Sequence, residues 1–248
     1  MLLMRYIDET HRYIDEEGSE YTPVTYFLKS FQEKVDWDKV AEKKAKKEGT
    51  TKEALLAQWA AKRDRAAEKG TLYHRMKEAE LLKSQDFFIV GYDVQRTGEY
   101  SGEKIDASVV LESGFTYVEK MVWSNRYKIC GTADLVTVHD DKIYVSDYKT
   151  NEKLETSSWK NPKTGKTRKL LHPLSHLDDC NFNLYQVQLN VYMYMLLQHN
   201  RNLKMGGMTI LHVQFDDKGN PTYTTHYPVE DLQKEVRAMF EIFKTNKK

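Results

Sequence analysis

The chain of 248 residues is 30% charged and 40% hydrophobic, which is the balance of a folded globular protein and not of a disordered one. Its longest wholly apolar run, Val191–Leu197, has seven residues, whereas a transmembrane helix needs about 20, so a membrane-spanning protein is excluded. With 38 Lys and Arg against 37 Asp and Glu, the net charge of +1 gives no whole-molecule argument for a nucleic-acid or membrane partner.

The first third of the sequence predicts helices with recognisable ends. Asp36 can cap a helix that stops at Gly49, and a second helix can begin after Thr51. The step at Lys69–Gly70 interrupts this second helix, and Thr71 can cap a third that runs to about residue 83. Before these helices we expect a small hairpin of residues 6–14 and 20–22, and a short helix after residue 23.

Period-two alternation in the second half predicts a sheet. Strands are expected at residues 115–123, 127–138 and 143–150, with the last two joined as a hairpin. The pattern from Phe87 to Leu111 is ambiguous. The remaining expected elements are a buried helix at 184–199, strands at 208–215 and 222–226, and a helix from about 229. The fold class is therefore α/β.

No repeat or linker divides the chain, so we expect one domain over residues 1–248. Its central mixed β-sheet would be flanked by helices, with a mainly helical N-terminal part at about 1–85 and a catalytic sheet core at about 115–226.

The beginning of the chain and its cysteines predict a cytoplasmic protein. Residues 1–17 contain no apolar stretch long enough for a signal peptide and too many acids for a mitochondrial transit peptide. Cys130 and Cys180 are too few for a disulfide framework or for a four-cysteine zinc or iron–sulfur site. We expect both to be buried, reduced thiols.

The predicted hairpin brings charged side chains together. If Asp140 and Asp141 form the centre of its turn, cross-strand partners have residue numbers that sum to 281, and Asp134 lies opposite Asp147. Two carboxylates on an apolar face repel each other unless a cation lies between them. Lys149 falls on the same face, about 7 Å along the strand from Asp147.

Two interpretations of these three residues remain open. Two aspartates beside a lysine at one strand end can form a divalent-metal site with oxygen ligands, which suits Mg²⁺ or Mn²⁺. Alternatively, Asp134 lies at an exposed strand edge, and Asp147 and Lys149 form an ordinary surface ion pair. We favour the metal site because Asp134 follows Gly131 on an otherwise apolar face.

The sequences around these residues resemble the PD-(D/E)XK nuclease superfamily. The similar segments are GTADLV at 131–136, VSDYKT at 145–150 and QLNVY at 188–192, and they resemble most closely the RecB-like and lambda-exonuclease-like branch found in many phage exonucleases. GTLYH at 70–74, the glutamate of VEKMVWS and PLSHLDDCN at 173–181 extend the resemblance over about residues 24–197. The implied fold is the restriction-endonuclease-like core.

The resemblance implies a role for each matching residue. Asp134, Asp147, the backbone carbonyl of Tyr148 and His74 would bind the catalytic metal, Mg²⁺ or Mn²⁺. Lys149 would orient or activate the attacking water. The remaining implied catalytic residues are Glu119, on the strand before the first aspartate, and Gln188 and Tyr192, one helical turn apart.

The implied activity is a metal-dependent deoxyribonuclease of DNA recombination, repair or replication, and family analogy favours an exonuclease. DNA is the implied partner, together with a recombination or single-strand-binding protein. The alternative is a non-catalytic DNA-binding or recombination module that keeps the fold. A structural Mg²⁺ or Ca²⁺ site without nucleic acid is a third interpretation. Ring-forming and monomeric members share these motifs, so they fix neither digestion polarity nor oligomeric state.

Two basic segments indicate where DNA would bind. Residues 29–77 hold fourteen Lys and Arg, and residues 151–170 hold six, in what reads as a loop or a long hairpin tip. If the second segment forms one wall of a DNA groove, its cations contact phosphates. The expected substrate-binding residues are Lys163, Lys166, Arg168 and Lys169.

Overall fold

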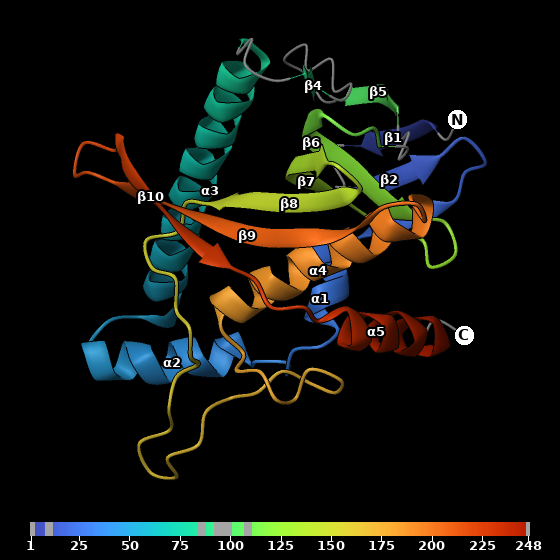
Figure 1. Ribbon diagram of the computed structural model, residues 1–248. Helices are drawn as coiled ribbons and strands as arrows, with labels where there is room; N and C mark the ends of the chain where they lie inside the picture. Colours follow the sequence, from blue (N-terminus) through green and yellow to red (C-terminus); the bar gives the residue numbers. More distant parts are fainter. Residues whose placement is uncertain (1–2, 8–11, 84–87, 92–100, 107–110, 247–248) are drawn as a thin grey trace.

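The computed structural model of the protein describes residues 3–7, 12–83, 88–91, 101–106 and 111–246. A mixed sheet forms the centre of the molecule, and helices cover it (Figure 1). The main path of strands runs β10-β9-β8-β7-β3-β2-β1-β5, and β6 and β4 continue the sheet from β7. The α/β fold class, with helices on the N-terminal side, is confirmed.

The bounds of the elements agree with most of the sequence expectations. The strands are β1 Leu3–Ile7, β2 Arg12–Asp15, β3 Glu20–Pro23, β4 Phe88–Gly91, β5 Ser101–Asp106, β6 Phe115–Ser124, β7 Ile129–His139, β8 Lys142–Lys149, β9 Lys204–Phe215 and β10 Pro221–Pro228. The helices are α1 Val24–Lys29, α2 Trp37–Glu48, α3 Lys52–Lys83, α4 Asn181–His199 and α5 Gln233–Asn246. Of the ambiguous stretch 87–111, only β4, β5 and residue 111 lie within the described residues.

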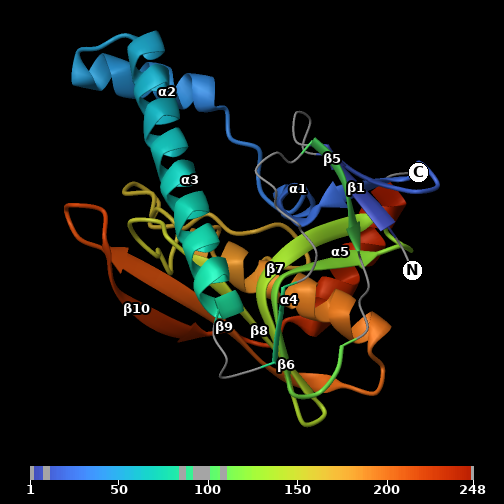
Figure 2. The same cartoon turned by 90° about the horizontal axis from the view of Figure 1, so that it is seen from above.

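Helix α2 has the ends that were expected. The side chain of Asp36 accepts a hydrogen bond from the backbone of Lys39, and Gly49 adopts the left-handed conformation that ends many helices. A small cluster, separate from the main core, joins α2 to α3 and consists of Ala41 and Ala45 of α2 and Leu55 of α3. Together, α2 and the first half of α3 form an arm that projects from the sheet (Figure 2).

The predicted break at Lys69–Gly70 is wrong, because α3 continues through it as one helix of 32 residues. A glycine inside a helix costs about 1 kcal/mol relative to alanine, which tertiary packing can offset. A Cβ on Gly70 would lie 3.1 Å from Thr150 Oγ1, so the glycine allows α3 to approach the end of β8 closely. Thr71 is consequently a residue of the helix interior and not a cap.

The hairpin register is confirmed over most of its length. Strands β7 and β8 pair from His139 and Lys142 to Leu135 and Ser146, around a turn in which Asp140 has a φ of 53°. The expected ladder pair of Asp134 and Asp147 would come next, but the ladder ends one step before it. There β8 continues beside β9, and β3 takes its place beside β7. We call this point, where β7 and β8 separate, the fork.

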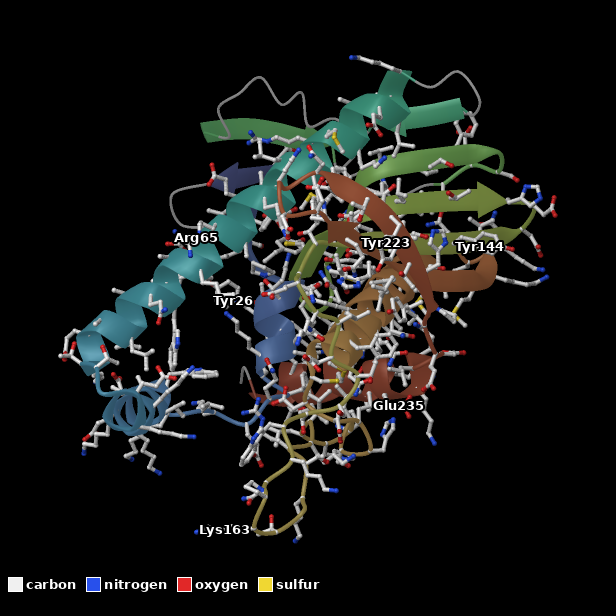
Figure 3. The ribbon with its side chains drawn as sticks, turned by 90° about the vertical axis from the view of Figure 1, so that its left-hand side faces the viewer. Tyr26, Arg65, Tyr144, Lys163, Tyr223 and Glu235 are labelled. Carbon is white, nitrogen blue, oxygen red and sulfur yellow. The ribbon has the colours of Figure 1, made fainter. Side chains whose placement is uncertain are left out.

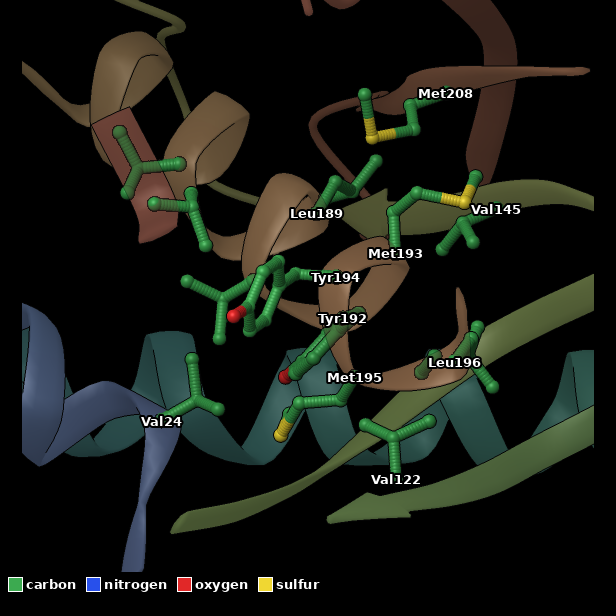
Figure 4. Close-up of a cluster of buried hydrophobic side chains, with 14 of the residues drawn as sticks. Val24, Val122, Val145, Leu189, Tyr192, Met193, Tyr194, Met195, Leu196 and Met208 are labelled. Atoms are coloured by element: carbon green, nitrogen blue, oxygen red, sulfur yellow. The ribbon is translucent and has the colours of Figure 1, made fainter. Parts of the chain in front are cut away.

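The core lies between the sheet and α4. This helix buries side chains on most of its surface because β6–β9 cover one side and α1 and α5 the other (Figure 4). The side chains of α4 that are fully buried include Val187, Leu189, Val191 and Met193. Cys130 and Cys180 are buried free thiols, as expected. No helix in the described ranges has the length and apolar character required to cross a bilayer.

Candidate metal centre at the fork

The fork holds both predicted aspartates in a nearly dry environment. Asp134 on β7 and Asp147 on β8 are 7% and 2% exposed. The backbone N–H of Tyr148 donates a hydrogen bond to Asp134 Oδ2 at 2.7 Å. This bond takes the place of the next ladder pair, and it fixes the Tyr148 peptide beside the first carboxylate. The two strands therefore stay connected at the fork through a side chain.

His74 and Glu119 complete a cluster of donor atoms around Asp134. His74 Nδ1 lies 3.3 Å from Asp134 Oδ1 and 3.7 Å from Glu119 Oε1. One donor atom from each of the three side chains lies within 4.8 Å of the others. The three come from α3, β6 and β7, which are distant in sequence. The fold thus brings together three of the residues that the sequence singled out.

Glu119 reaches this cluster with an unusual backbone. Its φ is 51° in the middle of β6, a region that a non-glycine residue adopts at a cost of about 1–3 kcal/mol. The pairs on both sides, Val118 with Leu135 and Lys120 with Ala133, keep one register, and only the step of Glu119 and Asp134 lacks ladder pairing. The sequence alone gives no signal of this conformation. Such local strain is characteristic of functional sites.

Asp147 and Lys149 form the other half of the site. The Lys149 ammonium contacts Asp147 Oδ2 directly, which is closer than the 7 Å expected from strand spacing alone. Lys149 Nζ also donates to Gln188 Oε1 at 3.1 Å and lies 4.5 Å from the centre of the Tyr185 ring. Gln188 Nε2 in turn donates to Tyr192 Oη at 2.7 Å. A continuous set of contacts thus runs from α4 to β8.

Gly131 explains why Tyr192 can occupy its position. A Cβ on this residue of β7 would lie 2.7 Å from Tyr192 Cε1, which is closer than real contacts allow. The same Cβ would lie 3.2 Å from Val24 Cγ2 on α1, so the space is also filled on that side. The sequence marked Gly131 only as a neighbour of Asp134, and its packing against Tyr192 was not expected. The glycine of the GTAD segment makes room for the tyrosine that holds Gln188.

The charges at the fork shift one another's protonation. Burial raises the pKa of Asp147 above its ordinary value, and the Asp134 carboxylate adds to this effect. Burial alone would lower the pKa of His74, but its hydrogen bonds to Asp134 and Glu119 outweigh burial and raise the pKa to about 10. For Lys149, likewise, the neighbouring carboxylates outweigh burial and raise the pKa. The three carboxylates of the fork thus favour the protonated, positively charged forms of His74 and Lys149.

These residues fit a divalent metal ion. Asp147 Oδ2 is buried and accepts no hydrogen bond of normal geometry from the described residues, although it contacts Lys149. The cluster of His74, Glu119 and Asp134 supplies two carboxylates and an imidazole. Carboxylate oxygens are preferred by Mg²⁺ and Mn²⁺, and imidazole binds transition metals as well. Within that cluster Glu119, which we expected only to assist catalysis, has the position of a metal ligand.

The expected DNA-binding cations lie on the loop between β8 and α4. Lys163 is at the far tip of this loop, away from the sheet (Figure 3). Arg168 Nε lies 2.7 Å from Asp179 Oδ2, and Lys169 Nζ lies 2.7 Å from Asp178 Oδ1. Two of the four cations are therefore used within the loop. Among the described residues, Lys163 and Lys166 have no carboxylate within ion-pairing distance.

Comparison with known protein families identifies a relationship that covers most of the chain. The family model of the PD-(D/E)XK nuclease superfamily matches residues 27–246. A search of curated proteins finds no match. The matched range includes all the side chains of the metal centre and the whole of α3 and α4.

Proposed function

Because this chain belongs to the PD-(D/E)XK nuclease superfamily, we propose that it hydrolyses DNA phosphodiester bonds with a divalent metal, Mg²⁺ or Mn²⁺, held at the fork. The observation that carries the proposal is the convergence of two groups of side chains. His74, Glu119 and Asp134 offer ligand atoms within 4.8 Å of one another, and Lys149 lies on the adjacent strand beside Asp147. A metal-binding set and a buried ammonium together suit phosphoryl transfer.

The residues of the metal centre have separate roles in the proposed reaction. Asp134, Asp147, Glu119, His74 and the Tyr148 carbonyl would hold the ion, which polarises the scissile phosphate and lowers the pKa of its water when bound. Lys149 would place its ammonium beside the charge that builds on the phosphoryl oxygens. Its positive charge is preserved near neutral pH because the neighbouring carboxylates raise its pKa.

Two residues of α4 act one step further from the reacting atoms. Gln188 accepts a hydrogen bond from Lys149, which orients the ammonium, and Tyr192 orients Gln188. Both residues are positioning residues in this scheme. The exonuclease mode and a role in DNA recombination, repair or replication are parts of the same proposal, and they rest on the resemblance of the motifs to the RecB-like branch. The expected cytoplasmic location stays a separate proposal that does not depend on these motifs.

The decisive experiment is cleavage of end-labelled DNA with and without metal. The protein should release labelled products with Mg²⁺ or Mn²⁺ and none after chelation. Asp147→Asn keeps the size of the side chain and removes its charge, so cleavage should fall by orders of magnitude while DNA binding and the folded state persist. Labels on the 5′ and 3′ ends of single and double strands also distinguish exonuclease from endonuclease products.

Three results would count against the proposal. Cleavage by Asp147→Asn at the wild-type rate would show that the fork is not the reaction centre. DNA binding without cleavage by the unmodified protein, in any divalent metal, would support the non-catalytic module. A Mg²⁺ or Ca²⁺ site without DNA binding would support a purely structural metal. Asp140→Asn is the matched control because Asp140 lies in the exposed turn at the opposite end of the hairpin.

A further inference from the structure

A basic groove runs beside α3 and ends next to the end of β8. It has a volume of about 850 Å³ and lies between one face of α3 and the four residues that follow Lys149. Its lining residues are Lys62, Arg63, Arg65, Ala66, Lys69, Thr150, Asn151, Glu152 and Lys153. The groove joins the two basic segments of the sequence, which are more than 70 residues apart, at one place on the surface.

Most of the positive charge in the groove is available to a ligand. Two of the five lining cations are ion-paired: Lys62 with Glu152, the acid of the lining, at 3.1 Å, and Arg63 with the neighbouring Asp64 at 2.9 Å. Within the described part of the chain, Arg65, Lys69 and Lys153 have no carboxylate at ion-pairing distance. Lys69 Nζ instead lies 4.2 Å from the centre of the Phe215 ring. The groove is therefore suited to an anion with several charges.

The position of the groove connects it to the metal centre. Lys69 is five residues before His74 on the same helix, and Lys62 is twelve, so they lie about 7.5 and 18 Å from His74 along the helix axis. On the other side, Thr150 is the residue directly after Lys149 and contacts α3 at Gly70. Figure 3 shows Arg65 on the middle part of α3. A chain of phosphates that passes the metal centre would continue along this face.

We propose that this groove binds the sugar–phosphate backbone of a single DNA strand on one side of the scissile phosphate. Lys69 and Arg65 contact successive phosphates, and the Thr150 hydroxyl donates to the phosphate nearest the metal centre. A groove of this volume is in the range of small-ligand sites, which suits a few nucleotides of one strand. The interval from Lys69 to Lys62 spans about 11 Å, or about three phosphates of a stacked strand.

This inference rests on the proposed nuclease function, but its test does not need turnover. Binding of a labelled ten-nucleotide single strand is measured in metal-free buffer at several salt concentrations. The test variant is Arg65→Gln with Lys69→Gln. The matched control is Lys43→Gln with Lys47→Gln, which makes the same charge change at exposed positions of α2, outside the groove.

The groove variant should weaken single-strand binding at least fivefold, and its slope of log affinity against log salt should fall by about 1.4, which is 0.7 for each phosphate that the variant no longer binds. The control should change affinity less than twofold. A blunt duplex of the same length should lose less affinity than the single strand. An unchanged slope, or an equal loss in the control, would overturn the groove as a binding site. An equal loss for the duplex would overturn its assignment to one strand.

These outcomes are distinct from failure of the proposed function. If the unmodified protein cleaves DNA, and the groove variant binds the single strand with the same affinity as the unmodified protein, the groove proposal is wrong and the nuclease proposal is retained. If no divalent metal supports cleavage but the groove variant still binds the single strand more weakly than the unmodified protein, the groove proposal is retained and the nuclease proposal is wrong.

Discussion

The fork and the loop between β8 and α4 both pair lysine or arginine with aspartate, but they do so in different surroundings. The side chains of Lys149 and Asp147 are 15% and 3% exposed, and the second carboxylate, Asp134, lies nearby. Those of Lys169 and Asp178 are 48% and 14% exposed. Water screens the loop pair, whereas the fork holds an excess of negative charge with little water. The loop also holds a buried carboxylate, Asp179, but that carboxylate is matched by Arg168. An excess of buried carboxylates, rather than burial alone, therefore distinguishes the proposed reaction centre from the pairs that order the loop.

Among the variants that test this comparison, removal of the Lys149 ammonium should have the largest effect on the rate of DNA cleavage. Lys149→Ala should slow single-turnover cleavage by about 10²- to 10³-fold, the loss typical of one group that stabilises transition-state charge. Gln188→Ala and Tyr192→Phe act through Lys149, so each should slow cleavage by about 10- to 100-fold or less. DNA affinity should remain similar in all three. The assignment fails if Lys149→Ala is the mildest variant in single-turnover assays.

The packing of Gly131 gives the next largest effect, and the chain offers a control for it. Gly131→Ala would force the buried Tyr192 ring to move, since the new Cβ would lie 2.7 Å from it. Overpacking of this kind costs about 1–3 kcal/mol, and the shift of Gln188 should lower the rate about tenfold. Tm and single-turnover rate measure the two losses.

Gly206→Ala is the matched change. Its Cβ would also meet a tyrosine ring, at 2.5 Å, but that ring belongs to Tyr144, which is 37% exposed. Tyr144 can rotate into solvent, so Tm should fall less and activity should be unchanged. Equal losses in the two variants would show that any added methyl group is harmful and that the place of Tyr192 is not special.

The smallest effect is expected on the loop. Lys163→Gln with Lys166→Gln should reduce DNA affinity a few-fold and lower the salt slope by about 0.7 to 0.9 for each phosphate that is no longer neutralised. Arg168→Gln with Lys169→Gln should mainly lower Tm, because Asp179 would lose its cation while 6% exposed. Fluorescence anisotropy over a salt series and thermal unfolding separate the two. A larger loss of affinity in the second variant, with an unchanged Tm, would contradict this division.

The sequence predicted the elements that local patterns determine. The helix ends at Asp36 and Gly49 and the register of the β7–β8 hairpin depend on capping and alternation, and all are present. The break at Gly70 was wrong because the packing of α3 against Thr150 outweighs helix propensity, and a sequence pattern does not contain that contact.

The residues that meet at the fork were predictable from the sequence, but their arrangement was not. Asp134, Asp147 and Lys149 could be brought together from strand alternation alone. Beyond the point where β7 leaves β8, β7 pairs with β3, which lies more than 100 residues earlier in the chain. The left-handed backbone of Glu119 and the contact of Gly131 with Tyr192 are likewise products of tertiary packing. Motif resemblance identified the side chains, and only the fold shows which of them touch.

The small cluster of Ala41, Ala45 and Leu55 gives the outer arm a stability of its own. Because this cluster does not join the main core, the tip of the arm can unfold locally while the sheet and α4 remain folded. The same helix α3 that begins in this cluster carries the basic groove in its middle and His74 near its end. Helix α3 therefore links a part of the molecule held by a small cluster to the proposed metal centre, so local unfolding at its outer end can occur without moving His74.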